Sequence, residues 1–156
     1  MQIRTLRLSN QIMRTVTGPM WHGPSLAELL RDVSYQKAAA RPIPGAHTIW
    51  EIVLHVVAWS DIARARLDGE RTGDPSPQED WPPVASAAAA DWTGAMSRLH
   101  DSHQALATAV RALDDAVLDE KVAGLDYTVA TLVRGVVEHG TYHGGQIALL
   151  KRALAK

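Results

Sequence analysis

The segment TVATLVRGVVEHGTYHGGQIALLKRAL spans residues 128–154. Its apolar residues recur every three or four positions, which is the period of a helix with one buried face. That buried stripe consists of Leu132, Val136, His139, His143, Ile147 and Leu150. Two histidines therefore lie where a helical bundle otherwise places aliphatic side chains. The stretch predicts a long bundle helix, from about Thr128 to Leu154, with polar chemistry on its buried face.

Three further segments have a helical pattern, and none shows the alternation of a β-strand bounded by turns. They cover about residues 25–40, 48–69 and 85–113. Ser25 with Glu28, and Thr48 with Glu51, have the spacing of a capping box, which marks the start of the first two helices. The sequence predicts an all-α four-helix bundle.

The connection at residues 69–83 is too long for a tight helix hairpin. Its glycines and prolines break any helix there: Gly69, Gly73, Pro75, Pro77, Pro82 and Pro83. Such a crossover can run the length of a bundle, so the second and third helices are expected to be parallel, in up-down-down-up order.

The chain of 156 residues has the length of one domain with one core. Residues 1–20 lack a strong period and contain the break Gly18-Pro19, so they are assigned to an N-terminal arm, with residues 21–156 forming the bundle domain. An ordered arm, a frayed tail and an artefact of start-site choice all fit these twenty residues.

Composition excludes several functions. The chain has no Cys, so it has no disulfide, thiolate metal site or cysteine nucleophile of its own. Its net charge of −1 gives no field for binding nucleic acid or an anionic membrane. No apolar run approaches the ~20 residues that cross a bilayer, and no export signal is visible, so a cytoplasmic protein is expected.

His139 and His143 form an HxxxH pair, which places both imidazoles on one face of a helix, one turn apart. HExxH proteases have a glutamate after the first histidine, where this chain has Gly140, so a protease of that type is excluded. A metal needs a third ligand, and His55 on the inward stripe of the second helix is the natural candidate. The pair alone also fits two solvated or hydrogen-bonded core histidines.

Glycines are unusually dense around this pair: Gly135, Gly140, Gly144 and Gly145. Each costs about 0.8 to 1 kcal/mol relative to Ala in a helix interior. Close approach of a neighbouring helix explains them structurally, and room for a metal, its waters and a substrate explains them functionally.

Two motifs carry a family resemblance: WEIVLH at residues 50–55, after a Pro-Gly turn, and EHGTYHGGQI at residues 138–147. Together they resemble the two signatures of the DinB/YfiT superfamily, over about residues 20–154. WHGPS at residues 21–25 and DWP at 80–82 are similar to one branch of it. The resemblance implies that His55, His139 and His143 bind nickel, zinc or a similar divalent ion.

Other side chains are weighed as pocket or supporting residues: Glu51, Trp59, His103, Tyr142 and Gln146. Glu51 either caps its helix or orients the ring of His55. His103 is a spare ligand or a core histidine. Trp59 and Gln146 share faces with the ligands, so they belong to the core or to the pocket, and Tyr142 is a candidate acid. His47, where the family usually has Trp, is expected to be exposed.

The resemblance implies a metal-dependent enzyme acting on a small molecule, either a thiol S-transferase with a low-molecular-weight thiol as cosubstrate or a hydrolase. No catalytic residue is assigned. The alternative is a non-catalytic or stress-related bundle protein with a structural or sensory metal. A homodimer is also expected, because relatives are often dimeric and because the arm and Trp81 have no obvious partner in their own chain.

Overall fold

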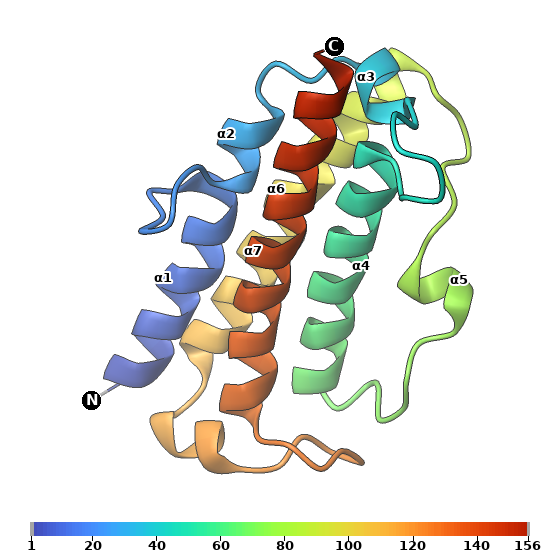
Figure 1. Ribbon diagram of the computed structural model, residues 1–156. Coiled ribbons are helices and arrows are strands. Elements are labelled where there is room, and N and C mark those ends of the chain that lie inside the picture. Colours follow the sequence, from blue (N-terminus) through green and yellow to red (C-terminus); the bar gives the residue numbers. More distant parts are fainter. Residues whose placement is uncertain (1, 156) are drawn as a thin grey trace.

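The computed structural model describes residues 2–155, and their regular elements are helices, apart from two isolated β-bridges (Figure 1). The long helices are α1 (Ile3–Thr17), α4 (Ile49–Leu67), α6 (Ala89–Ala112) and α7 (Val129–Leu154). Helices α1 and α4 each pack against both α6 and α7. Short elements lie in the connections: α2 (Leu26–Leu30), α3 (Tyr35–Ala39), α5 (Pro77–Asp80) and the 3-10 helix η1 (Asp115–Asp119). The all-α class is confirmed.

The single helix expected at residues 25–40 is wrong. The segment forms α2 and α3, and each begins at its own serine cap, Ser25 and Ser34. The Ser34 hydroxyl accepts a hydrogen bond from the backbone N–H of Lys37, so it starts a new helix where the prediction continued the old one. Serine favours helix starts over helix interiors for this reason. The capping boxes at Ser25 and at Thr48 are confirmed.

The first long helix is α1, which lies in the segment assigned to an arm. The expectation that residues 1–20 lack a strong helical period is wrong, because Leu8, Ile12 and Val16 form a buried helical stripe. Thr5, Ser9 and Thr15 are buried on the same helix, so its inward face mixes polar with apolar side chains.

The start of α1 also has no local cap. Gln2 makes no side-chain capping bond, and the carboxylate of Asp115 on η1 accepts the backbone N–H groups of Ile3 and Thr5 instead, at 3.0 and 2.9 Å. A cap that comes from so far along the chain is invisible to a local sequence pattern. The up-down-down-up order was assigned with residues 25–40 as its first helix, so that order and the domain boundary at residue 20 stay predictions.

The connection between α4 and α6 runs along the outside of α4 and carries α5 (Figure 1). Helix α5 packs against α4, which brings residues 80 and 81 over the middle of that helix. The candidate site lies there, between α4, α7 and the connection.

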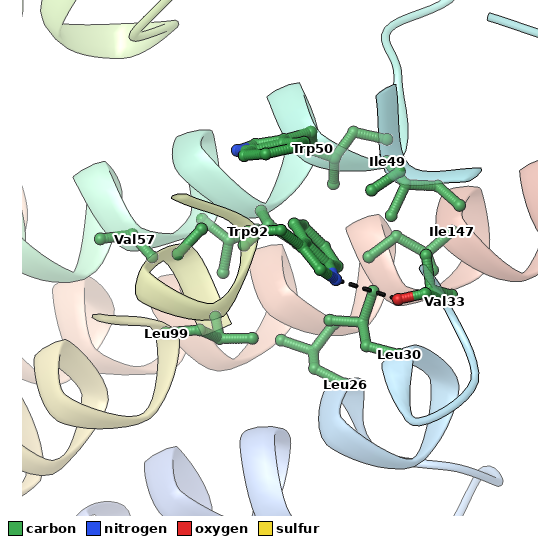
Figure 2. Close-up of a cluster of buried hydrophobic side chains, with 14 of the residues drawn as sticks. Leu26, Leu30, Val33, Ile49, Trp50, Val57, Trp92, Leu99 and Ile147 are labelled. Carbon is green, nitrogen blue, oxygen red and sulfur yellow. Dashed lines mark hydrogen bonds between the residues drawn. The ribbon is translucent and has the colours of Figure 1, made fainter. Parts of the chain in front are cut away.

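Two buried clusters fill the bundle, one toward each end of its long helices. Figure 2 shows the first, in which Trp50 and Trp92 pack with Ile147 and the leucines of α2. The indole N–H of Trp92 donates to the carbonyl of Val33 at 2.9 Å, which ties α6 to the segment between α2 and α3. The second cluster joins α1, α6 and α7 around Ile12, Leu106 and Val133.

The glycines of α7 differ in what surrounds them, which gives a matched pair of stability predictions. A Cβ on Gly140 would lie 2.5 Å from Cγ2 of the buried Thr15 on α1, whereas a Cβ on Gly145 would meet nothing within 4 Å. We expect Gly145→Ala to raise the free energy of unfolding by about 0.8 to 1 kcal/mol through helix propensity.

Gly140→Ala should lower the free energy of unfolding, because overpacking against Thr15 costs about 1 to 3 kcal/mol and outweighs the gain in helix propensity. Urea titration of both variants measures the difference. Equal stabilisation by the two alanines would contradict a close α1–α7 contact at Gly140.

Candidate metal centre

The structure brings together the three histidines that the sequence singled out. His55 lies on α4, and His139 and His143 lie one turn apart on α7. Nε2 of His139 is 2.9 Å from Nε2 of His55 and 3.0 Å from Nε2 of His143. One ring nitrogen of each histidine lies within 4.8 Å of the others, and in residues 2–155 no fourth His, Asp or Glu joins the group.

Hydrogen bonds on the far side of two rings fix where their protons lie. Nδ1 of His55 donates to the main-chain carbonyl of Asp80 at 2.6 Å, and Nδ1 of His143 donates to Oε1 of Gln146 at 2.7 Å. In a neutral imidazole with a proton on Nδ1, the other nitrogen, Nε2, carries an unprotonated lone pair. Two lone pairs thus face Nε2 of His139, which can carry at most one proton. A cation between the three nitrogens would satisfy all of them, so these residues fit a transition metal.

Burial keeps the three rings neutral. It lowers the pKa of His139 to about 3, helped by the repulsion that charged His143 and His55 would exert. Burial also lowers the pKa of His55 and of His143. Neutral imidazole is the form that ligates metals, so the group is ready to bind an ion at neutral pH.

The connection after α5 covers the histidines from outside. The indole of Trp81 stacks on the ring of His55, with centroids 3.8 Å apart, and on the ring of His47 on its other face, at 3.6 Å. Oδ1 of Asp80 accepts the indole N–H of Trp59 at 2.6 Å. The connection is therefore held at the site by aromatic stacking and by hydrogen bonds to α4.

A cavity of about 610 Å³ opens beside the three histidines. This volume suits a small-molecule ligand. Most of its lining surface is apolar, and α7 contributes Leu132, Gly135 and Val136. Side chains from α4, the connection and the segment before α7 complete the wall: Trp59, Arg66, Asp80, Trp81 and Tyr127.

Among the side chains weighed as pocket residues, Trp59, Tyr142 and Gln146 line this cavity. Glu51 does not reach the ring of His55: its carboxylate caps Thr48 at 2.6 Å and pairs with Arg41. The capping interpretation of Glu51 is confirmed.

His103 is fully buried on α6, where Nδ1 donates to the carbonyl of Leu99 at 2.8 Å. It does not join the three-histidine group. His47 is exposed, as expected, and lines the cavity through its stack on Trp81.

Sequence reasoning missed Arg66 as a lining residue, although the sequence holds a signal for it. Ile52, His55, Trp59 and Ile62 form the inward stripe of α4, and the next step of that stripe is Arg66. A charged residue on a buried stripe points to a special partner or a ligand. The contacts of Asp80 had no such signal, because they depend on how the connection folds back.

The two features that motivated a homodimer have partners within their own chain. The apolar face of α1 packs on α6 and α7, and Trp81 stacks on His55. The homodimer stays a prediction without that support. Among residues 2–155, no helix is both long and apolar enough to cross a membrane.

Comparison with known proteins agrees with this geometry. The family model described as DinB superfamily matches residues 21–147, which include α4, the connection and the histidine pair of α7. Searches of curated proteins and of solved structures gave no match. Since the match covers most of the chain, the protein belongs to the DinB superfamily.

Proposed function

We propose that this protein binds one divalent transition metal through His55, His139 and His143 and uses it as a metal-dependent thiol S-transferase. The observation that carries the proposal is the convergence of three neutral imidazole nitrogens at the wall of a cavity. Imidazole suits nickel and zinc, whereas magnesium and calcium prefer oxygen ligands. Nickel or zinc is therefore the expected ion.

The number of ligands supports a catalytic role over a structural or sensory one. Structural zinc sites are closed by four protein ligands, while catalytic sites have three and keep a position for water or substrate. The group here has three members within residues 2–155 and borders open cavity space.

The lining of the cavity favours thiol transfer over hydrolysis. A transition metal bound at the histidines would supply Lewis-acid stabilisation of an anionic thiolate or hydroxide. Asp80 is the one carboxylate among the described lining residues, and its Oδ1 already accepts from Trp59. A thiol, with a pKa of about 8.5, loses its proton to solvent far more readily than water, with a pKa of about 15.7, so a hydrolase depends more on a free general base. The chain has no Cys, so the thiol would be a second small molecule.

The remaining residues hold and shape the site in this proposal. The Asp80 carbonyl and the Gln146 side chain orient the rings of His55 and His143. Tyr142 lies at the exposed rim, and its hydroxyl accepts from Gln146 Nε2 at 3.1 Å. The hydroxyl proton of Tyr142 is then free to be donated to a leaving group.

The test is an activity screen of protein purified without an affinity tag and loaded with nickel or zinc. Low-molecular-weight thiols are offered with an aryl halide electrophile, and p-nitrophenyl acetate is offered without thiol. We expect thiol transfer that needs the metal and is lost in His139→Ala. Metal-dependent ester hydrolysis without thiol transfer would favour the hydrolase instead. No turnover, with a metal closed by four protein ligands, would favour the non-catalytic alternative.

Gln146→Leu tests the support of the His143 ring. Without the Oε1 acceptor, His143 loses the bond that holds its Nδ1 proton and orients Nε2. Losing such a partner typically lowers metal affinity about 10- to 100-fold. We expect that loss in competition titrations with a chromophoric chelator. Gln104→Leu on α6 is the matched control, since the exposed Gln104 bonds only to Thr108 among the described side chains.

The finer architecture belongs to the same proposal. We propose the up-down-down-up order with α1 as the first helix, a twofold homodimer, and action in the cytoplasm. Sedimentation equilibrium at micromolar concentration tests the dimer, and a strictly monomeric protein would refute it.

A further inference from the structure

Arg66 is a buried cation in the wall of the cavity. It lies on α4 three turns beyond His55, and its side chain is 3% exposed. It lines the same cavity as the histidines. An arginine is rarely buried to this degree unless a carboxylate or phosphate pairs with it.

Arg66 has one ion-pair partner among the described residues, and that partner is a solvent-exposed carboxylate. One terminal nitrogen donates to the Tyr127 hydroxyl at 2.8 Å and the other to the Gly73 carbonyl at 3.2 Å. The second of these nitrogens also donates to Oδ1 of Asp74, at 3.5 Å, and the Asp74 side chain is 92% exposed. Nε is buried and has no hydrogen-bond partner. A long ion pair to an exposed carboxylate offsets little of the cost of burying this cation, so a second anion in the cavity would stabilise it.

Trp59 separates this cation from the histidines. Its ring lies 5.6 Å from Cζ of Arg66 and 5.8 Å from the His139 ring, so the guanidinium is at most the sum of these distances from the His139 imidazole. The α7 wall of the cavity includes the apolar Leu132 and Val136. Asp80, the other charged lining residue, is bonded to Trp59 and close to His55, so it does not neutralise Arg66.

We propose that the cavity takes a substrate with a carboxylate at one end, held by Arg66 and Tyr127, and an apolar spacer that lies along Trp59. A planar guanidinium matches a carboxylate in charge and shape. The Tyr127 hydroxyl accepts from Arg66, which leaves its own proton to donate to the same carboxylate. This inference rests on the proposed function in one respect, that the other end of the substrate reacts at the histidines.

The probes are 4-phenylbutyrate and its neutral analogue 4-phenylbutyramide, titrated into the full chain by calorimetry. The protein is kept metal-free with a chelator, so that the carboxylate cannot bind a metal at the histidines instead. We expect the acid to bind at least about tenfold more tightly than the amide, since a charge-assisted hydrogen bond contributes about 1.5 to 3 kcal/mol. Equal affinities of acid and amide for the wild-type protein would overturn the proposal.

Arg66→Met tests whether Arg66 is the source of the preference for the acid over the amide. It keeps much of the apolar stem, and we expect the acid-over-amide preference to fall below about twofold. Arg64→Met is the matched control, because Arg64 lies on the same helix but has a side chain that is 41% exposed and paired with Asp68. A preference that survives in folded Arg66→Met would overturn the assignment.

If circular dichroism shows that Arg66→Met does not fold, Tyr127→Phe takes its place. That change removes the second donor, and the preference for the acid should then fall several-fold; an unchanged preference would overturn the assignment. These titrations need no metal. Failure of metal binding with a retained acid preference would therefore refute the proposed function alone, and metal binding without an acid preference would refute the carboxylate site alone.

Discussion

Replacing His139 with alanine is expected to lower bound nickel or zinc from one ion per chain to well under half. Nε2 of His139 lies between the other two Nε2 atoms, at 2.9 and 3.0 Å, so its loss leaves two imidazoles that no longer share a close neighbour. Two neutral ligands should not retain the ion through dialysis. His55→Ala and His143→Ala should lower the bound metal as far, because each also leaves only two imidazole ligands. Metal analysis of tag-free protein after dialysis measures it.

The matched control is His100→Ala, because His100 is an exposed histidine on α6 outside the three-histidine group. It should bind as much metal as the wild-type protein. Full occupancy in any one of the three ligand variants would remove that histidine from the metal centre. An ion held by oxygen atoms alone would overturn the whole assignment.

The three-histidine group could be predicted because it follows helical spacing. His139 and His143 continue the buried stripe of α7, and His55 lies on the buried stripe of α4, so a bundle that buries both stripes must bring them together. The same rule reaches Arg66, which was missed because charged side chains are assumed to end a buried stripe.

What escaped the sequence depends on contacts between distant segments. Asp115 caps the start of α1, and the Asp80 carbonyl accepts the Nδ1 proton of His55. Asp80 lies in the connection between α4 and α6, whose glycines and prolines give no pattern that predicts this contact. Ser34 is a different case. Its serine is a local signal for a helix start, but the helical pattern on both sides of it led to the prediction of one continuous helix. Non-local hydrogen bonds leave no pattern in neighbouring residues, so only the structure reveals them.

The metal-free protein is expected to lose stability as the pH falls from about 6.5 toward 4, and buried His103 should account for a large part of the loss. Burial lowers the pKa of His103 to about 4, and it lowers the pKa of His139 to about 3. An unfolded chain has the ordinary histidine pKa of about 6.5, so below that pH the unfolded state binds more protons than the folded one. Protonation therefore favours unfolding throughout this window, and the stabilising contribution of the neutral rings is fully present only above it.

His103→Asn isolates one of these groups, because the asparagine amide can replace the Nδ1 donor to the Leu99 carbonyl but does not titrate. Between about pH 7 and pH 4.5, the variant should lose roughly 2 to 3 kcal/mol less unfolding free energy than the wild type, because a tenfold change in proton affinity between the folded and unfolded states corresponds to about 1.4 kcal/mol. Urea titrations of both metal-free proteins at the two pH values give this difference, and comparing the losses cancels any constant cost of the substitution. Other groups that titrate at acid pH, including the carboxylates, contribute nearly equally to both proteins.

The matched control is His100→Asn, at an exposed histidine of the same helix, and it should lose as much stability as the wild type does. If His103→Asn loses as much stability as the wild type over this range, His103 is not the buried neutral group that its position on α6 indicates.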